Sequence, residues 1–314
     1  MSTTMFWNCR GARKKHTSNY LRHLVGDNEV LFVGLLETKI EVFARADADK
    51  LIGSGWDFVH RPATDRSRGI LILWQKDIVM FDVLEDNEQV VVGSLALPNG
   101  QKWTTAVVYA NKDHHVRRDL WDAIARHGSP DVPLLVGGDF SCCLSHADKK
   151  GGKRFIFSAG AQEMSEFMLN LDLHIFGFIR PQFTWSNNKD GVSRIWVRLD
   201  RCLMNSAGLL LAPFATIRHM GRVASDHAPL LLSLSLGGQP KSEKWLRFED
   251  VWTTFPTSWR ILWKAWSRND FRTPAEVLNR KCRRTLRTLF HWCRNRVREL
   301  TDKQTRAECR ILEL

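Results

Sequence analysis

Near its middle the chain reads Leu134-Leu135-Val136-Gly137-Gly138-Asp139-Phe140-Ser141. The three branched aliphatic residues predict a short buried strand, and the two glycines predict a tight turn that brings the backbone close to a ligand. An aspartate at the end of a buried strand is costly unless a partner compensates its charge. That partner is usually a metal ion or a catalytic proton shuttle. A structural aspartate that caps the strand-to-loop turn is the alternative, and this stretch alone leaves both interpretations open.

Other segments repeat this arrangement of an apolar run that meets a polar side chain. The polar residues concerned are Asn8, Glu37, Tyr109, Asp139, Asp200, Asp226 and His227. All but Asp200 lie at, or just outside, the end of their apolar run, whereas Asp200 lies within the strand-like stretch 195–205. For Glu37 taken alone, the sequence favours a structural salt bridge to Lys39.

A convergence of these side chains would have a clear chemical use. Three or four carboxylates at one place repel each other, and a hard cation such as Mg²⁺ or Mn²⁺ relieves that repulsion by taking oxygen ligands. A histidine beside them can be held by one carboxylate and can stabilise the negative charge that develops during phosphate-ester hydrolysis. Spacing along the sequence does not by itself establish that the residues converge.

The order of predicted elements indicates an α/β protein. Short apolar segments between residues 56 and 109 predict mostly β structure, and Pro98-Asn99-Gly100 predicts a hairpin. Helices are predicted at 18–25, from Val116 through Leu120 to Ile124, and around 164–171. The basic loop 149–154 follows the candidate site closely, so it is a candidate for phosphate contact, with a solvated loop as the alternative. Gly237-Gly238-Gln239-Pro240 marks a boundary and gives two domains, 1–237 and 238–314.

The second predicted domain carries most of the positive charge. Lys241 to Leu314 contains 18 Lys and Arg against 9 Asp and Glu, a net of +9, whereas residues 1–240 contain 28 against 25, a net of +3. Thr273-Pro274-Ala275-Glu276 predicts a helix start. The expected apolar face of that helix consists of Leu278, Cys282, Leu286, Leu289, Cys293, Val297 and Leu300. Arginines flank this face, so the helix either packs against protein or binds a polyanion, with DNA as the first candidate and RNA as a second.

Composition narrows the class of protein. Hydrophobic residues make up 44% and charged residues 25%, which is typical of a soluble globular protein. No apolar run approaches the roughly 20 residues of a membrane span, and the first ten residues do not resemble a secretory signal. The seven cysteines are odd in number and include no Cys-x-x-Cys, so we expect reduced thiols in an intracellular protein.

Six short motifs occur in a fixed order: Trp-Asn-Cys-Arg-Gly at 7–11, Leu-Leu-Glu-Thr-Lys at 35–39, Val-Tyr-Ala-Asn at 108–111, Gly-Gly-Asp-Phe-Ser at 137–141, Arg-Leu-Asp-Arg at 198–201 and Ser-Asp-His-Ala-Pro at 225–229. In this order they resemble the endonuclease/exonuclease/phosphatase superfamily, which includes deoxyribonuclease I, exonuclease III-type apurinic endonucleases and inositol polyphosphate 5-phosphatases. The chain is most similar to the endonuclease domain of plant LINE-type (non-LTR) retrotransposons. That likeness rests on Phe-Thr-Trp-Ser-Asn-Asn-x-Asp-Gly at 183–191 and Arg-Phe-Glu-Asp-Val-Trp at 247–252, and the resemblance as a whole covers residues 5–236.

The resemblance implies a four-layer α/β/β/α sandwich, here followed by a basic helical extension. It implies that Glu37 ligates Mg²⁺ or Mn²⁺ with Asn8 and Asp226 close by. His227, oriented by Asp200, would stabilise the pentacovalent phosphate. The remaining implied roles are phosphate contact for Tyr109 and orientation or activation of the attacking water for Asp139. The expected function is that of a DNA-nicking endonuclease of retrotransposon origin, acting in the nucleus.

One departure from the family pattern concerns Ser141. The family pattern is Gly-Asp-Phe-Asn, and the missing amide would help to hold water and phosphate, so we expect weakened activity. No Tyr/Phe-x-Asp-Asp of a reverse transcriptase occurs, which suggests an element fragment or a truncated gene product. Two alternatives remain: a phosphoesterase acting on a small phosphate ester, which the basic tail disfavours, and a catalytically weak or inactive relic that only binds nucleic acid.

Overall fold

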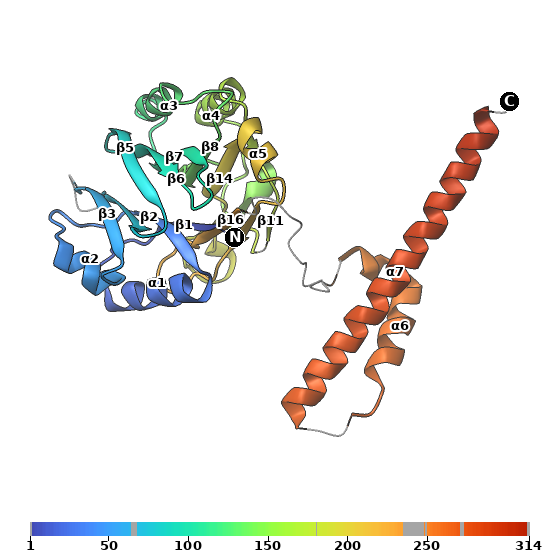
Figure 1. Ribbon diagram of the computed structural model, residues 1–314. Coiled ribbons are helices and arrows are strands. Elements are labelled where there is room, and N and C mark those ends of the chain that lie inside the picture. Colours follow the sequence, from blue (N-terminus) through green and yellow to red (C-terminus); the bar gives the residue numbers. More distant parts are fainter. Residues whose placement is uncertain are drawn as a thin grey trace. The chain divides into compact units, whose positions relative to one another are not determined.

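The computed structural model describes residues 2–63, 68–179, 181–234, 248, 250–270 and 273–312, without the side chains of 294, 297–299 and 301–312. The chain divides into two compact units, Met1–Pro240 and Lys241–Leu314 (Figure 1). The domain boundary predicted at 237/238 lies outside the described residues, and so it stays a prediction.

The first unit is built on two mixed β-sheets. The seven-stranded sheet has the order β11-β15-β16-β1-β2-β4-β3 and the six-stranded sheet has the order β10-β14-β8-β7-β6-β5. The strands of the first sheet are β1 Ser2–Asn8, β2 Val30–Leu36, β3 Trp56–Arg61, β4 Ile70–Gln75, β11 Phe178–Ile179, β15 Thr216–His219 and β16 Leu230–Leu234. Those of the second are β5 Met80–Asp86, β6 Val90–Ala96, β7 Lys102–Tyr109, β8 Leu134–Asp139, β10 Leu173–Ile175 and β14 Asp200–Asn205. Three two-residue strands, β9 Lys149–Lys150, β12 Trp185–Ser186 and β13 Trp196–Val197, form a small third sheet.

The two large sheets pack face to face around one buried cluster. Phe6 and Phe32 from one sheet meet Val107 and Leu135 from the other within it. The packing is close at Gly137, where an added Cβ would lie only 2.5 Å from Cε2 of Phe6. The glycine that the sequence assigned to a turn therefore lies within a strand, where its missing side chain admits the ring of Phe6. Gly138 does have a positive φ of 143°, and a Cβ there would lie 2.0 Å from the carbonyl oxygen of Val108.

Helices cover the outer face of each sheet (Figure 1). The helices are α1 Lys15–Asp27, α2 Arg45–Leu51, α3 Arg118–Ala125, α4 Ala159–Asn170 and α5 Ser206–Leu211. Leu21 of α1 and Leu51 of α2 belong to a cluster with the outward residues of β1 and β2. Ile124 of α3 and Met164 of α4 belong to a third cluster with residues of β7 and β8. Three clusters between four layers confirm the predicted α/β/β/α sandwich.

Two local predictions were wrong. The stretch 195–205 is not one strand, because the chain leaves the small sheet after β13 and enters the six-stranded sheet at Asp200. Thr184 supports this break: its Oγ1 accepts the backbone N–H groups of both Leu199 and Asp200 at 3.0 Å. Helix α3 begins at Arg118, so Val116 lies before it and is 42% exposed.

The second unit consists of the short 3-10 helix η3 (Asp250–Thr254), α6 (Pro256–Trp266) and α7 (Pro274–Leu312). The predicted helix start is confirmed, since Thr273 Oγ1 donates to Glu276 Oε2 at 3.0 Å. The predicted apolar face is partly wrong, because Leu278 and Cys282 are exposed whereas Thr285 and Leu289 are buried. α7 is long, but no described helix is both long and apolar enough to cross a bilayer.

Arg284 explains the rotation of the α7 packing face. Its Nε donates to the carbonyl oxygen of Ala265 at 2.8 Å, and its Nη2 contacts Asp270 Oδ2 at 2.7 Å. The sequence placed Arg284 at the flank of the face, because the apolar periodicity of the helix does not show this ion pair. The pair holds the side of α7 that carries Arg284 against the end of α6.

Candidate active site

Strand pairing brings the predicted polar residues to one edge of the two sheets. β1 and β2 are parallel with Asn8 beside Leu36, so Asn8 and Glu37 end up as neighbours. β7 and β8 are parallel with Tyr109 beside Asp139, and β14 runs antiparallel to β8 with Asp200 opposite Asp139. Asp200 therefore begins its strand at the same edge where the others end theirs.

A cavity of about 660 Å³ opens at this edge. Six of the predicted site residues line it: Asn8, Glu37, Tyr109, Asp139, Ser141 and His227. Asp200 lies behind the ring of His227, and Asp226 contacts Arg10 and Trp185 Nε1 at 2.5 and 2.9 Å. Lys149, from the loop predicted to contact phosphate, also lines the cavity.

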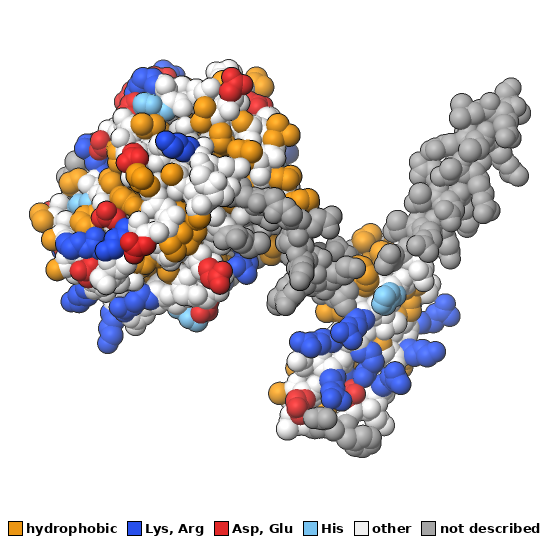
Figure 2. Space-filling view, in the orientation of Figure 1, with side chains coloured by type: hydrophobic (Ala, Val, Ile, Leu, Met, Phe, Trp, Pro, Cys, Tyr) orange, Lys and Arg blue, Asp and Glu red, His pale blue; other side chains and the backbone are white. Residues whose placement is uncertain are grey.

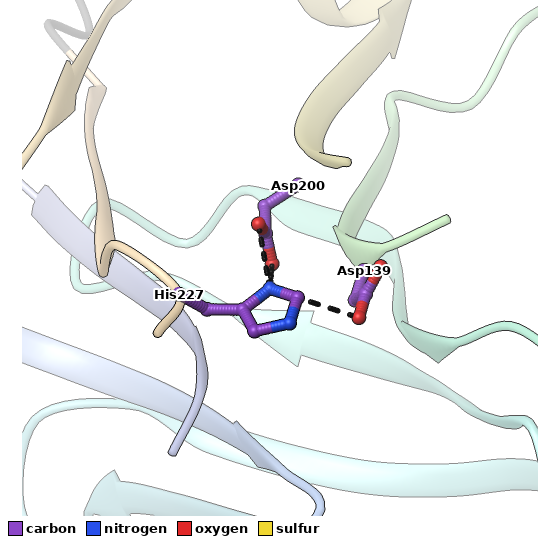
Figure 3. A group of neighbouring side chains, drawn as sticks. All are labelled: Asp139, Asp200 and His227. Atoms are coloured by element: carbon purple, nitrogen blue, oxygen red, sulfur yellow. Dashed lines mark hydrogen bonds and ion pairs between the residues drawn. The ribbon is translucent and has the colours of Figure 1, made fainter. Parts of the chain in front are cut away.

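His227 is held between two aspartates (Figure 3). Its Nδ1 lies 3.0 Å from Asp200 Oδ2 and 3.8 Å from Asp139 Oδ2, and all three residues are buried. Burial alone would lower the pKa of His227, but the negative charges of Asp200 and then Asp139 outweigh it and raise that pKa to about 9. The ring is therefore positively charged at neutral pH, and its Nδ1–H is donated to Asp200.

Asp139 is fixed by two donors that carry no charge. Asn8 Nδ2 donates to its Oδ2 at 3.0 Å, and the backbone N–H of Ser141 donates to its Oδ1 at 2.9 Å. The Asp139 carboxylate is thus oriented toward the cavity by neutral groups rather than by an arginine or a lysine. Such a group can accept a proton or orient a water molecule.

Glu37 carries more partners than the sequence suggested. The expected salt bridge to Lys39 is confirmed at 3.3 Å, and Arg10 Nε also lies 3.3 Å from the carboxylate. Tyr109 donates its hydroxyl to Glu37 Oε2 at 3.4 Å. Burial, and then the charge of Glu37, raise the pKa of Tyr109, so its hydroxyl stays protonated. Arg10 is a site residue that the sequence interpretation missed.

Strained backbone is concentrated at the site. Seven non-glycine residues in the described part of the chain have positive φ, and four of them belong to this edge: Arg10, Glu37, Lys39 and Ser141, with φ between 47° and 58°. This left-handed conformation is uncommon for these residue types, and it persists only where the surroundings enforce it. Here it turns the chain sharply at strand ends, so that consecutive side chains reach the cavity.

Two buried arginines fix the loop after Asp139 by donating hydrogen bonds to the carbonyl oxygens of residues 140–142. Arg117 Nη1 donates to the carbonyl oxygens of Phe140 and Ser141 at 3.3 and 3.2 Å. Arg201 Nη1 donates to Cys142 O at 2.8 Å while its Nη2 pairs with the buried carboxylate of Asp148 at 2.9 Å. Arg201 stands in the Arg-Leu-Asp-Arg motif without an assigned role, and nothing in the sequence around Arg117 indicates its contacts.

The residues at this edge fit a hard divalent cation. Asn8 is 1% exposed, and its Oδ1 is a buried acceptor without a hydrogen-bond partner among the described residues. An orphaned amide oxygen beside a buried carboxylate is suited to a cation that takes oxygen ligands. Asp139, Asp200 and His227 form a second possible group, since their ligand atoms lie within 4.8 Å of one another. His227 is hydrogen-bonded to Asp200, and Asp139 to Asn8 and Ser141, which suits a proton relay better. Glu37, with Asn8 and Asp226, is the group that could hold a cation.

Fold and site define a class: α/β/β/α sandwiches that carry a carboxylate-and-histidine site at the edge of both sheets. Residues 5–227 match the model of the Endonuclease/Exonuclease/phosphatase family, and the chain belongs to that family. Its members are typically hydrolytic nucleases and phosphatases, and they commonly use divalent metals. A search among curated proteins finds no sequence match.

Solved structures share the fold. The endonuclease domain of TRAS1, a telomere-specific non-LTR retrotransposon, is similar with a TM-score of 0.57 and 18% identity, over 76% of this chain and 100% of that domain. An AP endonuclease from Leishmania major is similar with a TM-score of 0.56 and 19% identity, over 74% of this chain and 86% of its own. An AP endonuclease from Archaeoglobus fulgidus is similar with a TM-score of 0.56 and 14% identity, over 75% of this chain and 100% of its own. At these identities the likeness concerns the fold alone.

Proposed function

We propose that this chain is a divalent-metal-dependent phosphodiesterase that nicks DNA, that it derives from a LINE-type retrotransposon similar to those of plants, and that it acts in the nucleus. The observation that carries the activity is the buried pair Asp200–His227 beside Asp139, at the same cavity as Glu37. The similarity to a retrotransposon endonuclease and to two AP endonucleases supports a DNA substrate.

The chain's own residues divide the hydrolysis into separate tasks. Asp139, oriented by Asn8 and by the Ser141 N–H, accepts the proton of the attacking water as the new oxygen–phosphorus bond forms. The bond from phosphorus to the leaving sugar oxygen breaks, and that oxygen takes up a proton from solvent. His227, charged and held by Asp200, donates from Nε2 to the phosphate oxygen on which negative charge grows. When bound at Glu37, Asn8 and Asp226, Mg²⁺ or Mn²⁺ would add neutralisation of that charge. Tyr109 keeps its proton and lines the cavity, where its hydroxyl would contact the same phosphate.

Ser141 favours a second candidate, a relic that binds nucleic acid but cleaves it slowly or not at all. The serine lines the cavity next to Asp139, where the family pattern has an amide. The intact group of Glu37, Asp139, Asp200 and His227 supports activity instead. We therefore propose a weakened enzyme over an inactive one.

The second unit supports a polyanionic partner, with DNA first and RNA second. Figure 2 shows Lys and Arg side chains gathered on the face of the second unit that it displays. Arg280, Arg283 and Arg287 of α7 are exposed. Trp259 and Trp263 on α6 are 56% and 73% exposed. Exposed cations attract phosphates, and exposed aromatic rings can stack on unpaired bases.

The test is nicking of supercoiled plasmid with Mg²⁺, with Mn²⁺ and with a chelator. We expect nicking only with a divalent cation, and near-complete loss in Glu37→Ala and in His227→Ala. Glu166→Gln is the matched control, because Glu166 is an exposed carboxylate of α4 and this helix contributes no residue to the lining of the cavity. This variant should nick like the unmodified protein. Undiminished cleavage by a folded, nuclease-free preparation of either site variant would overturn the assignment.

A further inference from the structure

We propose that Arg10 is a built-in counter-cation of the site, which competes with the divalent cation for Glu37 and Asp226. This inference rests on the proposed function, because it concerns the same metal-binding carboxylates. It assigns to Arg10 a positioning role that neither the family match nor the motif order defines. The role has two parts: Arg10 holds the two carboxylates together, and it must give way before both can turn to a cation.

The contacts of Arg10 carry the proposal. Its Nε lies 3.3 Å from both oxygens of Glu37, and its Nη1 lies 2.5 Å from Asp226 Oδ2. The two carboxylates come from distant segments, one after β2 and one before β16, and Arg10 bridges them. Their side chains are 5% and 11% exposed, so the guanidinium compensates two charges that have little solvent around them. One planar fork that serves two carboxylates is a use for which arginine is suited and lysine is not.

Competition follows from these contacts. A hard cation binds through the lone pairs of carboxylate oxygens, and these are the acceptors that the N–H groups of Arg10 use. A guanidinium and a divalent cation at the same oxygens would also repel each other across a short distance in a partly desolvated site. Binding of either one therefore weakens binding of the other, and the coupling is reciprocal.

Arg10 can move aside without a change of fold. Its side chain is 44% exposed and lines the cavity, while its backbone is fixed by the left-handed turn at φ 50°. A guanidinium released into the cavity would face the site of the scissile phosphate, for which it is a bidentate donor. Phosphate binding would then draw Arg10 from the carboxylates and favour metal uptake. The nucleic acid and the cation would thus assist each other through one side chain.

Lys39 offers a matched control within the same site. It carries the same charge as Arg10, and its Nζ also lies 3.3 Å from the Glu37 carboxylate. Lys39→Gln and Arg10→Gln each remove one positive charge beside Glu37, but only the second removes the bridge to Asp226. A general electrostatic effect would change both variants alike, whereas the proposed competition predicts a larger change for Arg10.

The experiment measures the affinity for Mn²⁺ by isothermal titration calorimetry and by electron paramagnetic resonance, without any nucleic acid. Arg10→Gln should bind Mn²⁺ about ten- to a hundredfold more tightly than the unmodified protein, a range typical of coupled ligands. Lys39→Gln should change the affinity by less than Arg10→Gln does. Arg10→Lys can pair with one carboxylate but cannot bridge two, so its affinity for Mn²⁺ should lie between those of the unmodified protein and Arg10→Gln. This variant also tests the proposal if the glutamine variant does not fold.

Glu37→Gln separates this inference from the proposed function. If Glu37→Gln binds Mn²⁺ as well as the unmodified protein does, the metal assignment itself fails. If Glu37→Gln weakens binding while the Arg10 variants bind no more tightly than the unmodified protein, only the competition is refuted. Equal gains for Lys39→Gln and Arg10→Gln would likewise refute the bridge and leave a general charge effect.

Discussion

Replacement of Ser141 by asparagine is the sharpest perturbation of this site. The backbone at Ser141 is already in the left-handed conformation with φ 47°, its N–H donates to Asp139, and its carbonyl oxygen accepts from Arg117. Asparagine tolerates this conformation better than serine does. It also places an amide, with two donors and one acceptor, where the serine hydroxyl offers one donor and reaches less far. The substitution should therefore leave the loop in place and lengthen its polar reach into the cavity.

The magnitude follows from the charge that develops at the phosphate. One well-placed donor to such an anion contributes on the order of 3 kcal/mol, or about a hundredfold in rate. A water molecule that bridges from the serine hydroxyl would recover part of this contribution. We therefore expect Ser141→Asn to nick about ten- to a hundredfold faster than the unmodified chain, with little change in affinity, because the contact acts mainly in the transition state.

The assay is single-turnover nicking of one labelled duplex in Mg²⁺, with affinity measured separately in Ca²⁺. Ser141→Gly is the matched control, since glycine accepts the left-handed backbone freely and adds no side chain. A gain in Ser141→Asn that Ser141→Gly lacks would come from the amide. An equal gain in both would come from relief of backbone strain. An equal or slower rate for the folded asparagine variant would show that Ser141 is not the weak point of the enzyme.

Three further predictions concern stability and the second unit. His219 is buried, and burial lowers its pKa from 6.5 to about 4, so between these two pH values the unfolded chain binds a proton at His219 that the folded chain does not. Through His219 the free energy of unfolding should therefore fall by about 3 kcal/mol as pH drops from 7 to 4. His219→Phe should flatten that pH dependence, as measured by urea titrations. Asp148→Asn leaves the buried Arg201 without its charged partner, which should cost about 3–5 kcal/mol of unfolding free energy; a loss below 1 kcal/mol would contradict this. Truncation at Gly238 removes a net charge of +9 and should leave the sandwich folded. Affinity for duplex DNA should fall, and the salt dependence of that affinity should flatten by about one unit per lost phosphate contact. Unchanged affinity would mean that the tail packs or binds protein.

The convergence of the predicted residues follows from the sequence wherever strand topology determines position. Asn8, Glu37, Tyr109 and Asp139 end apolar runs. Parallel neighbouring strands of a sheet end at one edge, so Asn8 lies near Glu37 in one sheet and Tyr109 near Asp139 in the other once the pairing is known. Asp200 was misplaced because apolar residues lie on both sides of it, at 195–197 and 202–204, and hide the change of sheet. The hydroxyl of Thr184, which supports that change, comes from a segment 15 residues earlier than Leu199. No periodicity within the stretch could show it.

The contacts of these arginines were not predictable, for a different physical reason. A motif shows which residue types occur in order, but it does not show which carbonyl oxygens or carboxylates lie within reach of a long side chain. Arg10, Arg117 and Arg201 have partners 23 to 216 residues away in sequence, besides a few close ones. On sequence alone, an arginine is expected at the surface, because its charge is costly to bury without partners. In the folded chain the partners come from segments that are distant in sequence.

Phe6 and Gly137 link the core to the chemistry of the edge. Gly137 lies beneath the ring of Phe6, two residues before Asp139, and Phe6 itself lies two residues before Asn8. The contact between the ring and the bare backbone thus sets how closely β1 of one sheet approaches β8 of the other. That approach places Asn8 Nδ2 at 3.0 Å from Asp139 Oδ2 and leaves Asn8 Oδ1 available to a cation. Gly137, which the sequence assigned to a turn after the strand, therefore acts through packing, and the position of the acid after it depends on the core between the sheets.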